Sequence, residues 1–279
     1  MNEIKKIFVL NLERRKDKLN FMKYKLNDIG IKNYEVIYGI DGEIDLECEV
    51  LYENYLKTMK DDDYIPNTKI PFIHKKTVFA IIKSFKIIYE KVLDYDYDEN
   101  SRILIFEDDV IFSKKFNSWS KLDYENDVIY LGANQNSFKK EWKGNYSLEN
   151  DFKYITNGMY SIIYKVSFIK KFYNKYLTDI SNIRKPIDYL LWRFITENKI
   201  SNIVVFPNLT IPNLLNSDNM EPRDLIKYLK LKKWNLNNYK FINLEMKYND
   251  LVNNCKRIKK GKIDNIYYST IYKIIDGNF

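Results

Sequence analysis

Compact apolar runs alternate with amphipathic segments over about the first 210 residues of the chain. Each run is bounded by polar or turn residues, as expected for a buried strand. The runs are residues 4–10, 34–38, 102–106, 128–131, 156–163 and 203–206. Residues 14–29 and 77–93 carry apolar side chains three and four positions apart, which predicts helices with one buried face. Helices are also expected over residues 44–59, 167–176 and 186–197.

This alternation predicts an α/β fold with a mostly parallel central sheet flanked by helices, because two strands joined by a crossover helix run parallel. After Pro222 the pattern changes to two or three helices rich in lysine and arginine. We therefore expect a catalytic or binding domain over residues 1–222 and a basic helical C-terminal extension over residues 223–279, packed on that domain or appended to it.

Charge is concentrated in that extension. Residues 223–279 hold 13 Lys/Arg and 5 Asp/Glu, so they carry the whole formal charge of +8, and residues 1–222 are neutral. One interpretation is a solvated helical face. The other is a docking segment for an anionic partner, such as a membrane surface, a polyanion or an acidic protein.

Composition excludes several classes of protein. Hydrophobic residues at 45% and charged residues at 30% are typical of globular proteins. No apolar stretch approaches the roughly 18 residues of a membrane span, and the apolar run near the N-terminus is too short for a signal peptide. We therefore expect a soluble cytoplasmic protein, with peripheral membrane association left open. One histidine and two distant cysteines argue against zinc and disulfide frameworks, and neither GxGxxG nor GxxxxGKS occurs.

The most informative polar cluster is Glu107-Asp108-Asp109, which directly follows the apolar run 102–106. The carboxyl end of a parallel strand faces the crevice in which open α/β sheets bind ligands. Three adjacent carboxylates repel one another unless cations compensate them, and Mg²⁺ and Mn²⁺ prefer such oxygen ligands together with substrate phosphates. The alternative is a solvated turn.

Two further acidic clusters are expected to be solvent loops. Residues 94–98 have the DxDxD spacing of a calcium loop but lack its glycine at position 6 and its glutamate at position 12. Residues 61–63, three consecutive aspartates, precede no predicted strand.

Six segments, taken in order, form a further pattern. They are Ile7-Phe8-Val9-Leu10-Asn11-Leu12-Glu13-Arg14-Arg15-Lys16-Asp17-Lys18, Gly39-Ile40-Asp41-Gly42, Ile105-Phe106-Glu107-Asp108-Asp109-Val110, Asp127-Val128-Ile129-Tyr130-Leu131-Gly132, Thr156–Ile163 and Pro186-Ile187-Asp188. In this order and spacing they resemble glycosyltransferase family 25, the lipooligosaccharide-type and collagen-type galactosyltransferases with a GT-A-like fold. The resemblance covers roughly residues 4–212.

The resemblance implies a metal-dependent, inverting transfer of a hexose, galactose or glucose, from a UDP-sugar to a hydroxyl of a glycan or glycosylated protein. It assigns Glu107 and Asp109 to Mn²⁺ or Mg²⁺, and Asp188 to the general base that deprotonates the acceptor. The implied donor-binding residues are Asn11, Leu12, Arg14, Arg15, Asp17 and Asp108.

One segment departs from the family pattern. The family has Gly-Cys-x-x-Ser-His in the helix before the acidic cluster, whereas this chain has Ala80-Ile81-Ile82-Lys83-Ser84-Phe85 and so keeps only the serine. A first alternative is therefore a non-catalytic relative that still binds a sugar nucleotide. A second is a metal-dependent nucleic-acid enzyme that uses the acidic cluster and the basic extension. Because residues 1–222 are neutral, we expect no specific nucleic acid.

Overall fold

A computed structural model describes residues 4–122, 124–135, 145 and 156–212. The predicted basic extension, residues 223–279, lies outside the described residues. A six-stranded sheet forms the centre of the fold, and β8 alone runs opposite to the other five strands. Its order is β2 (Glu35–Gly39), β1 (Ile4–Leu12), β3 (Arg102–Glu107), β8 (Ser161–Lys165), β5 (Val128–Tyr130) and β9 (Asn202–Val204).

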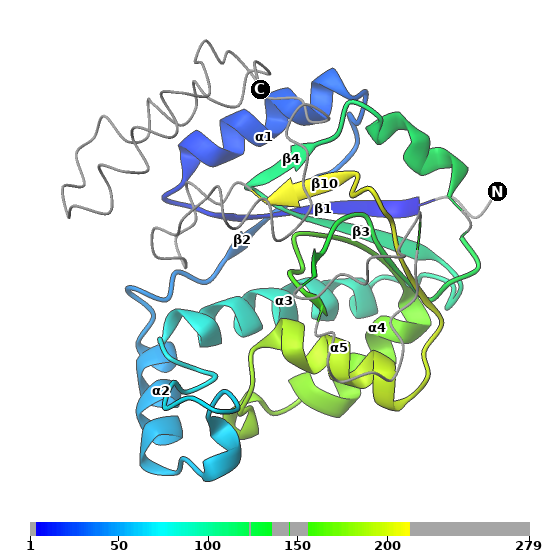
Figure 1. The fold of residues 1–279 in the computed structure, drawn as a ribbon. Coiled ribbons are helices and arrows are strands. Elements are labelled where there is room, and N and C mark those ends of the chain that lie inside the picture. The colour runs from blue at the N-terminus through cyan, green and yellow to red at the C-terminus, as the bar shows by residue number, and fades with distance from the viewer. Residues whose placement is uncertain (1–3, 123, 136–144, 146–155, 213–279) are drawn as a thin grey trace, which may run out of the picture.

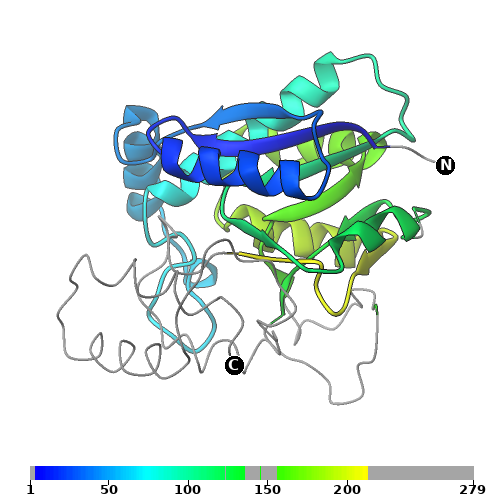
Figure 2. The same cartoon turned by 90° about the horizontal axis from the view of Figure 1, so that it is seen from above.

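Helices cover both faces of this sheet (Figure 1). Helix α1 (Lys16–Asp28) lies along β1 on one face, as the view from above also shows (Figure 2). Helices α3 (Thr77–Asp94), α4 (Val166–Phe172) and α5 (Ile187–Glu197) cover the other face, and α2 (Leu46–Lys57) packs against α3. The predicted α/β architecture with a mostly parallel central sheet is confirmed.

The alternating pleat of β3 explains the two layers of core. Ile103 and Ile105 point into the core under α3, α4 and α5, whereas Leu104 and Phe106 point into the core under α1. All four side chains are fully buried. Because β3 is apolar on both faces, it runs through the middle of the sheet and carries Glu107 to the edge of the core.

Short elements complete the fold at the carboxyl ends of the central strands. Strand β4 (Val110–Phe112) pairs with β10 (Thr210–Pro212), and β6 (Asn134–Gln135) pairs with β7 (Thr156–Asn157). Three short 3₁₀ segments cover residues 61–63, 116–121 and 180–182. Among the described helices, none is long and apolar enough to cross a bilayer.

Two predicted elements differ from the structure. The strand expected over residues 156–163 is divided into β7 and β8, because the chain turns at Gly158, whose φ of +93° is readily adopted only by glycine. The helix expected over residues 167–176 is α-helical only to Phe172 and continues as one π-helical turn, Tyr173–Leu177.

The aspartate run at 61–63 is not wholly a solvent loop. Asp63 is only 3% exposed, and its carboxylate lies 3.2 Å from the Arg184 guanidinium and 4.0 Å from the Lys185 ammonium. Its Oδ2 also accepts a hydrogen bond from the backbone N–H of Lys60. These contacts join the segment after α2 to the segment that leads into α5, so the predicted solvent exposure is wrong for Asp63.

The buried ion pair predicts a difference in stability between two neighbouring aspartates. We expect Asp63→Asn to lower the free energy of unfolding by about 3 kcal/mol, because Arg184 and Lys185 lose their anionic partner. Arg184 is partly exposed, which keeps the loss from being larger. Asp62→Asn changes an exposed neighbour and is expected to cost less than about 0.5 kcal/mol. Urea denaturation of both variants tests this, and equal midpoints would refute it.

Candidate active site

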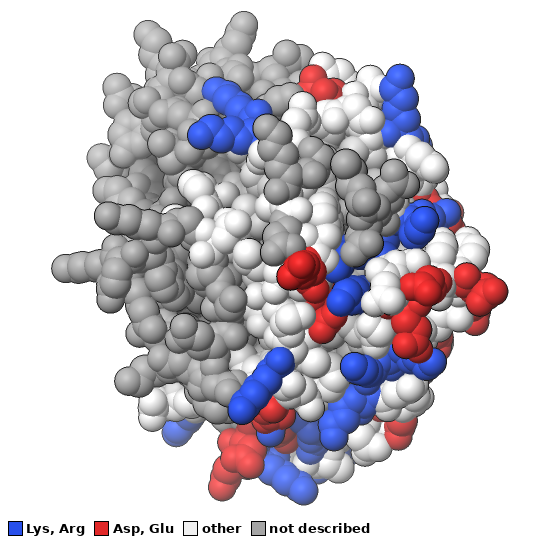
Figure 3. Space-filling model, turned by 90° about the vertical axis from the view of Figure 1, so that its right-hand side faces the viewer, with Lys and Arg blue, Asp and Glu red and all other residues white. Residues whose placement is uncertain are grey.

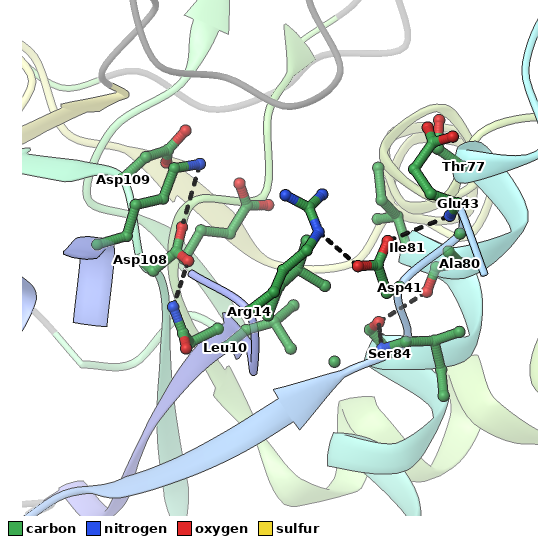
Figure 4. A pocket seen from close by; sticks show the side chains of 17 residues that line it. Leu10, Arg14, Asp41, Glu43, Thr77, Ala80, Ile81, Ser84, Asp108 and Asp109 are labelled. Carbon is green, nitrogen blue, oxygen red and sulfur yellow. Dashed lines mark hydrogen bonds and ion pairs between the residues drawn. The ribbon is translucent and has the colours of Figure 1, made fainter. Parts of the chain in front are cut away.

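A pocket opens at the carboxyl ends of β1, β2 and β3, where the sequence places its most informative polar residues (Figure 4). One wall is the turn after β3, another is the turn after β2, and the first turns of α3 close the far side. Predicted site residues that line it are Asn11, Leu12, Arg14, Glu107, Asp108 and Asp109. The remaining pocket residues are Leu10, Lys18, Gly39, Ile40, Asp41, Gly42, Glu43, Thr77, Ala80, Ile81 and Ser84.

Glu107, Asp108 and Asp109 form the acidic turn between β3 and β4. Glu107 ends β3, and the two aspartates make the turn. The Asn11 Nδ2 donates a hydrogen bond of 2.6 Å to Asp108 Oδ2, and the Lys18 Nζ lies 3.7 Å from Asp108 Oδ1. Because Asn11 is the penultimate residue of β1 and Lys18 is in the first turn of α1, the β1–α1 unit fixes the central carboxylate of the turn.

The acidic turn strongly perturbs the pKa of Glu107. Burial raises the pKa of this carboxyl well above its ordinary value, and the negative charges of Asp109 and Asp108 raise it further. The ammonium of Lys18 opposes this effect only in part. The site thus holds more negative potential than its own cations neutralise, which favours binding of an additional cation.

Two buried lysines of α1 lie beside the acidic turn, and the sequence alone indicated a role for neither. Lys18 and Lys25 are 7% and 4% exposed. Lys25 donates a hydrogen bond to the carbonyl oxygen of Val110, and burial lowers its pKa to about 7 against the opposing charge of Asp109. Lys18 lies four positions before Met22 and Lys25 three positions after it, so both share the buried face of α1. This spacing is the sequence signal that could have indicated their burial.

The opposite wall is a turn packed tightly against α3. The Arg14 Nε donates to Asp41 Oδ2 at 2.5 Å, and Ser84 Oγ accepts from the Ile40 backbone N–H at 2.8 Å. A Cβ on Gly39 would lie 2.8 Å from Ser84 Oγ, and one on Gly42 would lie 2.7 Å from the Thr77 backbone. Glycine at both positions therefore lets the turn approach α3, which brings Asp41 to Arg14 (Figure 4).

Three predicted site residues do not line the pocket. Arg15 pairs with Asp17 at 2.9 Å, and the Asp17 side chain is largely exposed. Asp188 lies in the first turn of α5, where its Oδ2 accepts a 3.3 Å hydrogen bond from the Gly158 N–H. Burial raises the Asp188 pKa against the hydrogen bonds that lower it, and its charge also acts on Glu107. Asp188 is thus close enough to act on Glu107, although it does not line the pocket.

The side chains of the acidic turn could hold a divalent ion only with the help of further ligands. Among the described residues, no group of three or more His, Cys, Asp or Glu side chains is arranged to hold a metal. Asp108 is already bound by Asn11 and Lys18. Mg²⁺ and Mn²⁺ are, however, commonly held by one or two carboxylates while phosphates and water complete the shell. Glu107 and Asp109, with excess negative potential, fit an ion of that kind.

Comparison with known proteins identifies the family of the chain. The model of glycosyltransferase family 25, described as an LPS biosynthesis protein, matches residues 4–185, about two thirds of the chain. The chain therefore belongs to glycosyltransferase family 25, and this membership points to a glycosyltransferase. The matched range contains the acidic turn and ends three residues before Asp188. A search of curated protein sequences found no match.

Among solved structures, the chain is similar to the inositol-1-phosphate CTP transferase from T. maritima. The two are 13% identical, and the alignment covers 82% of this chain and 96% of that chain with a TM-score of 0.39. A likeness of this size supports no argument about activity or ligand.

The raised pKa of Glu107 predicts a pH-dependent effect of Glu107→Gln without divalent ions. The folded protein holds this proton more tightly than the unfolded chain, so the wild type loses stability as pH rises from roughly 4.5 towards the folded pKa. The variant avoids that loss. We expect its melting temperature to exceed that of the wild type by a few degrees at roughly pH 7.5, and the difference to shrink towards pH 4.5.

Thermal melts of Glu107→Gln and of Glu13→Gln, an exposed position, give the comparison. A Glu107→Gln protein less stable than the wild type at both pH values would contradict the expected electrostatic strain.

Proposed function

We propose that this protein transfers a hexose, galactose or glucose, from a UDP-sugar to a hydroxyl group of a glycan or glycosylated protein. The observation that carries the proposal is the acidic turn at the end of β3, which faces Arg14 across the pocket. The family of the chain, glycosyltransferase family 25, gives this pocket its reading as a donor site. Carboxylates at a strand end beside a guanidinium suit a nucleoside diphosphate and its counter-ion.

The donor's diphosphate is the group that the pocket must bind and then stabilise as it leaves. Arg14 lies on the pocket wall, 45% exposed, where its guanidinium can reach phosphate oxygens while Asp41 orients it. Glu107 and Asp109 are the residues that would hold Mn²⁺ or Mg²⁺, whose charge would offset the charge that develops on the leaving diphosphate. Asn11 and Leu12, at the end of β1, complete the donor side.

Asp188 is the general base in this proposal. An inverting transfer needs a carboxylate that takes the proton of the acceptor hydroxyl as its oxygen attacks the anomeric carbon. Burial raises the pKa of Asp188, which makes its carboxylate a stronger base than an exposed aspartate. With this base, the acceptor hydroxyl is expected to bind on the side of α5, next to Asp188.

The missing histidine at position 85 does not argue for an inactive relative. Phe85 is fully buried in the core beneath the sheet and does not line the pocket. The retained Ser84 holds the glycine turn by accepting from Ile40 and donating to the Ala80 carbonyl oxygen. The change at position 85 therefore alters packing and leaves the polar groups of the pocket in place.

A nucleic-acid enzyme is disfavoured by the charge pattern on one face of the protein. On the face shown in Figure 3, Lys and Arg side chains alternate with Asp and Glu side chains instead of forming a basic band. A protein that tracks a nucleic-acid backbone presents such a band next to its catalytic carboxylates. The predicted anionic partner of residues 223–279 lies outside the described residues and stays a prediction.

A scan of UDP-, GDP- and CDP-sugars, with and without Mn²⁺, tests the proposed function. We expect release of UDP from UDP-galactose or UDP-glucose that depends on the ion. Asp109→Asn should lower the rate by roughly 100-fold or more, because the leaving diphosphate loses its stabilisation. Asp62→Asn, distant and exposed, serves as the control. Metal-independent release, or a fully active Asp109→Asn, would refute the assignment.

Asp188→Asn tests the base separately. We expect kcat for transfer to fall by about 10²- to 10⁴-fold, with little change in the KM for the donor, because only the proton acceptor is lost. Steady-state kinetics with the acceptor identified by the scan provide the measurement. Glu197→Gln, at the other end of α5, should behave as the wild type. A large rise in donor KM with unchanged kcat would assign Asp188 to binding instead.

A further inference from the structure

Two of the lysines of α1, Lys18 and Lys25, are buried, and burying a lysine is costly. Removing an ammonium from water costs several kcal/mol unless neighbouring groups compensate it. Lys18 is compensated by Asp108, and Lys25 by the Val110 carbonyl oxygen. Helix α1 thus brings two lysine side chains to the acidic turn at the end of β3, and Lys18 is the one paired with a carboxylate of that turn.

These contacts divide the acidic turn into two parts. The carboxylate of Asp108 is held from both sides, by the Asn11 amide at 2.6 Å and by the Lys18 ammonium at 3.7 Å. Its oxygens are directed to protein groups, which makes them poor ligands for an ion in the pocket. Glu107 and Asp109, the other two carboxylates of the turn, are the ligands that the proposed function assigns to the ion.

The ammonium of Lys18 also acts on the ion itself. It lines the same pocket as Glu107 and Asp109, so it repels any divalent cation that approaches them. A nucleoside diphosphate changes that balance, since its negative charges attract both the lysine and the ion, and its oxygens supply the missing ligands. An ion that binds alone gains two carboxylate ligands but is repelled by the Lys18 ammonium. An ion that binds with the diphosphate also gains phosphate oxygens in its coordination shell, and the diphosphate offsets the charge of the lysine.

We propose that Lys18 keeps the affinity of the acidic turn for a lone divalent ion low, so that the ion is retained only together with the donor's diphosphate. Lys18 does so by holding Asp108 away from coordination and by its own positive charge. It is thus a positioning and charge-balancing residue. The proposal rests on the proposed function, since it assumes an ion at Glu107 and Asp109.

Mn²⁺ titrations followed by the electron paramagnetic resonance of free Mn²⁺ test this without any turnover. MnCl₂ is added to the full-length protein, once alone and once with saturating UDP. We expect weak binding to the wild type alone and clearly tighter binding with UDP. Lys18→Met should bind Mn²⁺ alone about tenfold more tightly than the wild type, because a unit positive charge and the restraint on Asp108 are both lost.

Two matched variants separate charge from packing. Lys18→Arg retains the charge and should titrate as the wild type, and Lys23→Met removes an exposed lysine of the same helix and should also leave the affinity unchanged. If Lys18→Met does not fold, as judged by circular dichroism, Lys18→Gln is measured in its place.

The outcomes distinguish this inference from the proposed function. If Asp109→Asn abolishes Mn²⁺ binding in the presence of UDP but Lys18→Met titrates as the wild type, the ion site stands and the role of Lys18 is refuted. Tight Mn²⁺ binding to the wild type without UDP also refutes it. If no protein binds Mn²⁺ even with UDP, the inference and the metal-dependent function fail together.

Discussion

Repulsion among three adjacent carboxylates at the end of a buried strand is the constraint on which the site depends. The protein cannot move them apart, because β3 runs through the core and ends at Glu107. It compensates with groups from β1 and α1: Asn11 and Lys18 bind Asp108. The compensation is incomplete: beyond the effect of burial, the charges of Asp109 and Asp108 raise the pKa of Glu107 more than the ammonium of Lys18 lowers it. The residual negative potential is the property that a cation-dependent donor site needs.

A second constraint is steric and lies on the opposite wall. Gly39 and Gly42 bring the turn after β2 into direct contact with α3. Ser84 Oγ accepts a hydrogen bond from the Ile40 N–H of the turn and donates one to the Ala80 carbonyl oxygen within α3. That contact sets the position of Asp41, which in turn holds Arg14. Ion pairs and hydrogen bonds therefore fix the wall formed by the acidic turn, whereas the two glycines allow the close packing that fixes the opposite wall. The pocket lies between these two walls.

The sequence predicted the regular elements well because periodicity is local. The β1–α1–β2 unit and the acidic turn followed from patterns within about 30 residues. Contacts between distant residues leave no such pattern, as with Asn11 and Asp108, which are 97 positions apart. Strands of three residues, such as β4, are too short to show alternation. Asp63 and the α1 lysines were misjudged or missed for a related reason, since a charged residue is expected in solvent until a distant partner is known.

The departure at position 85 shows that a residue of a family motif need not line the ligand pocket. A family pattern records residues that occur together, without distinguishing those that face a ligand from those that support them. Here Ser84 supports the glycine turn and Phe85 faces the core, so the substitution is a change in packing. The polar groups of the pocket, Arg14 and the acidic turn among them, come from other segments and are all retained. The other two departures, Ala80 and Ile81, do line the pocket, so any effect of this segment on a ligand acts through those two apolar side chains and not through position 85.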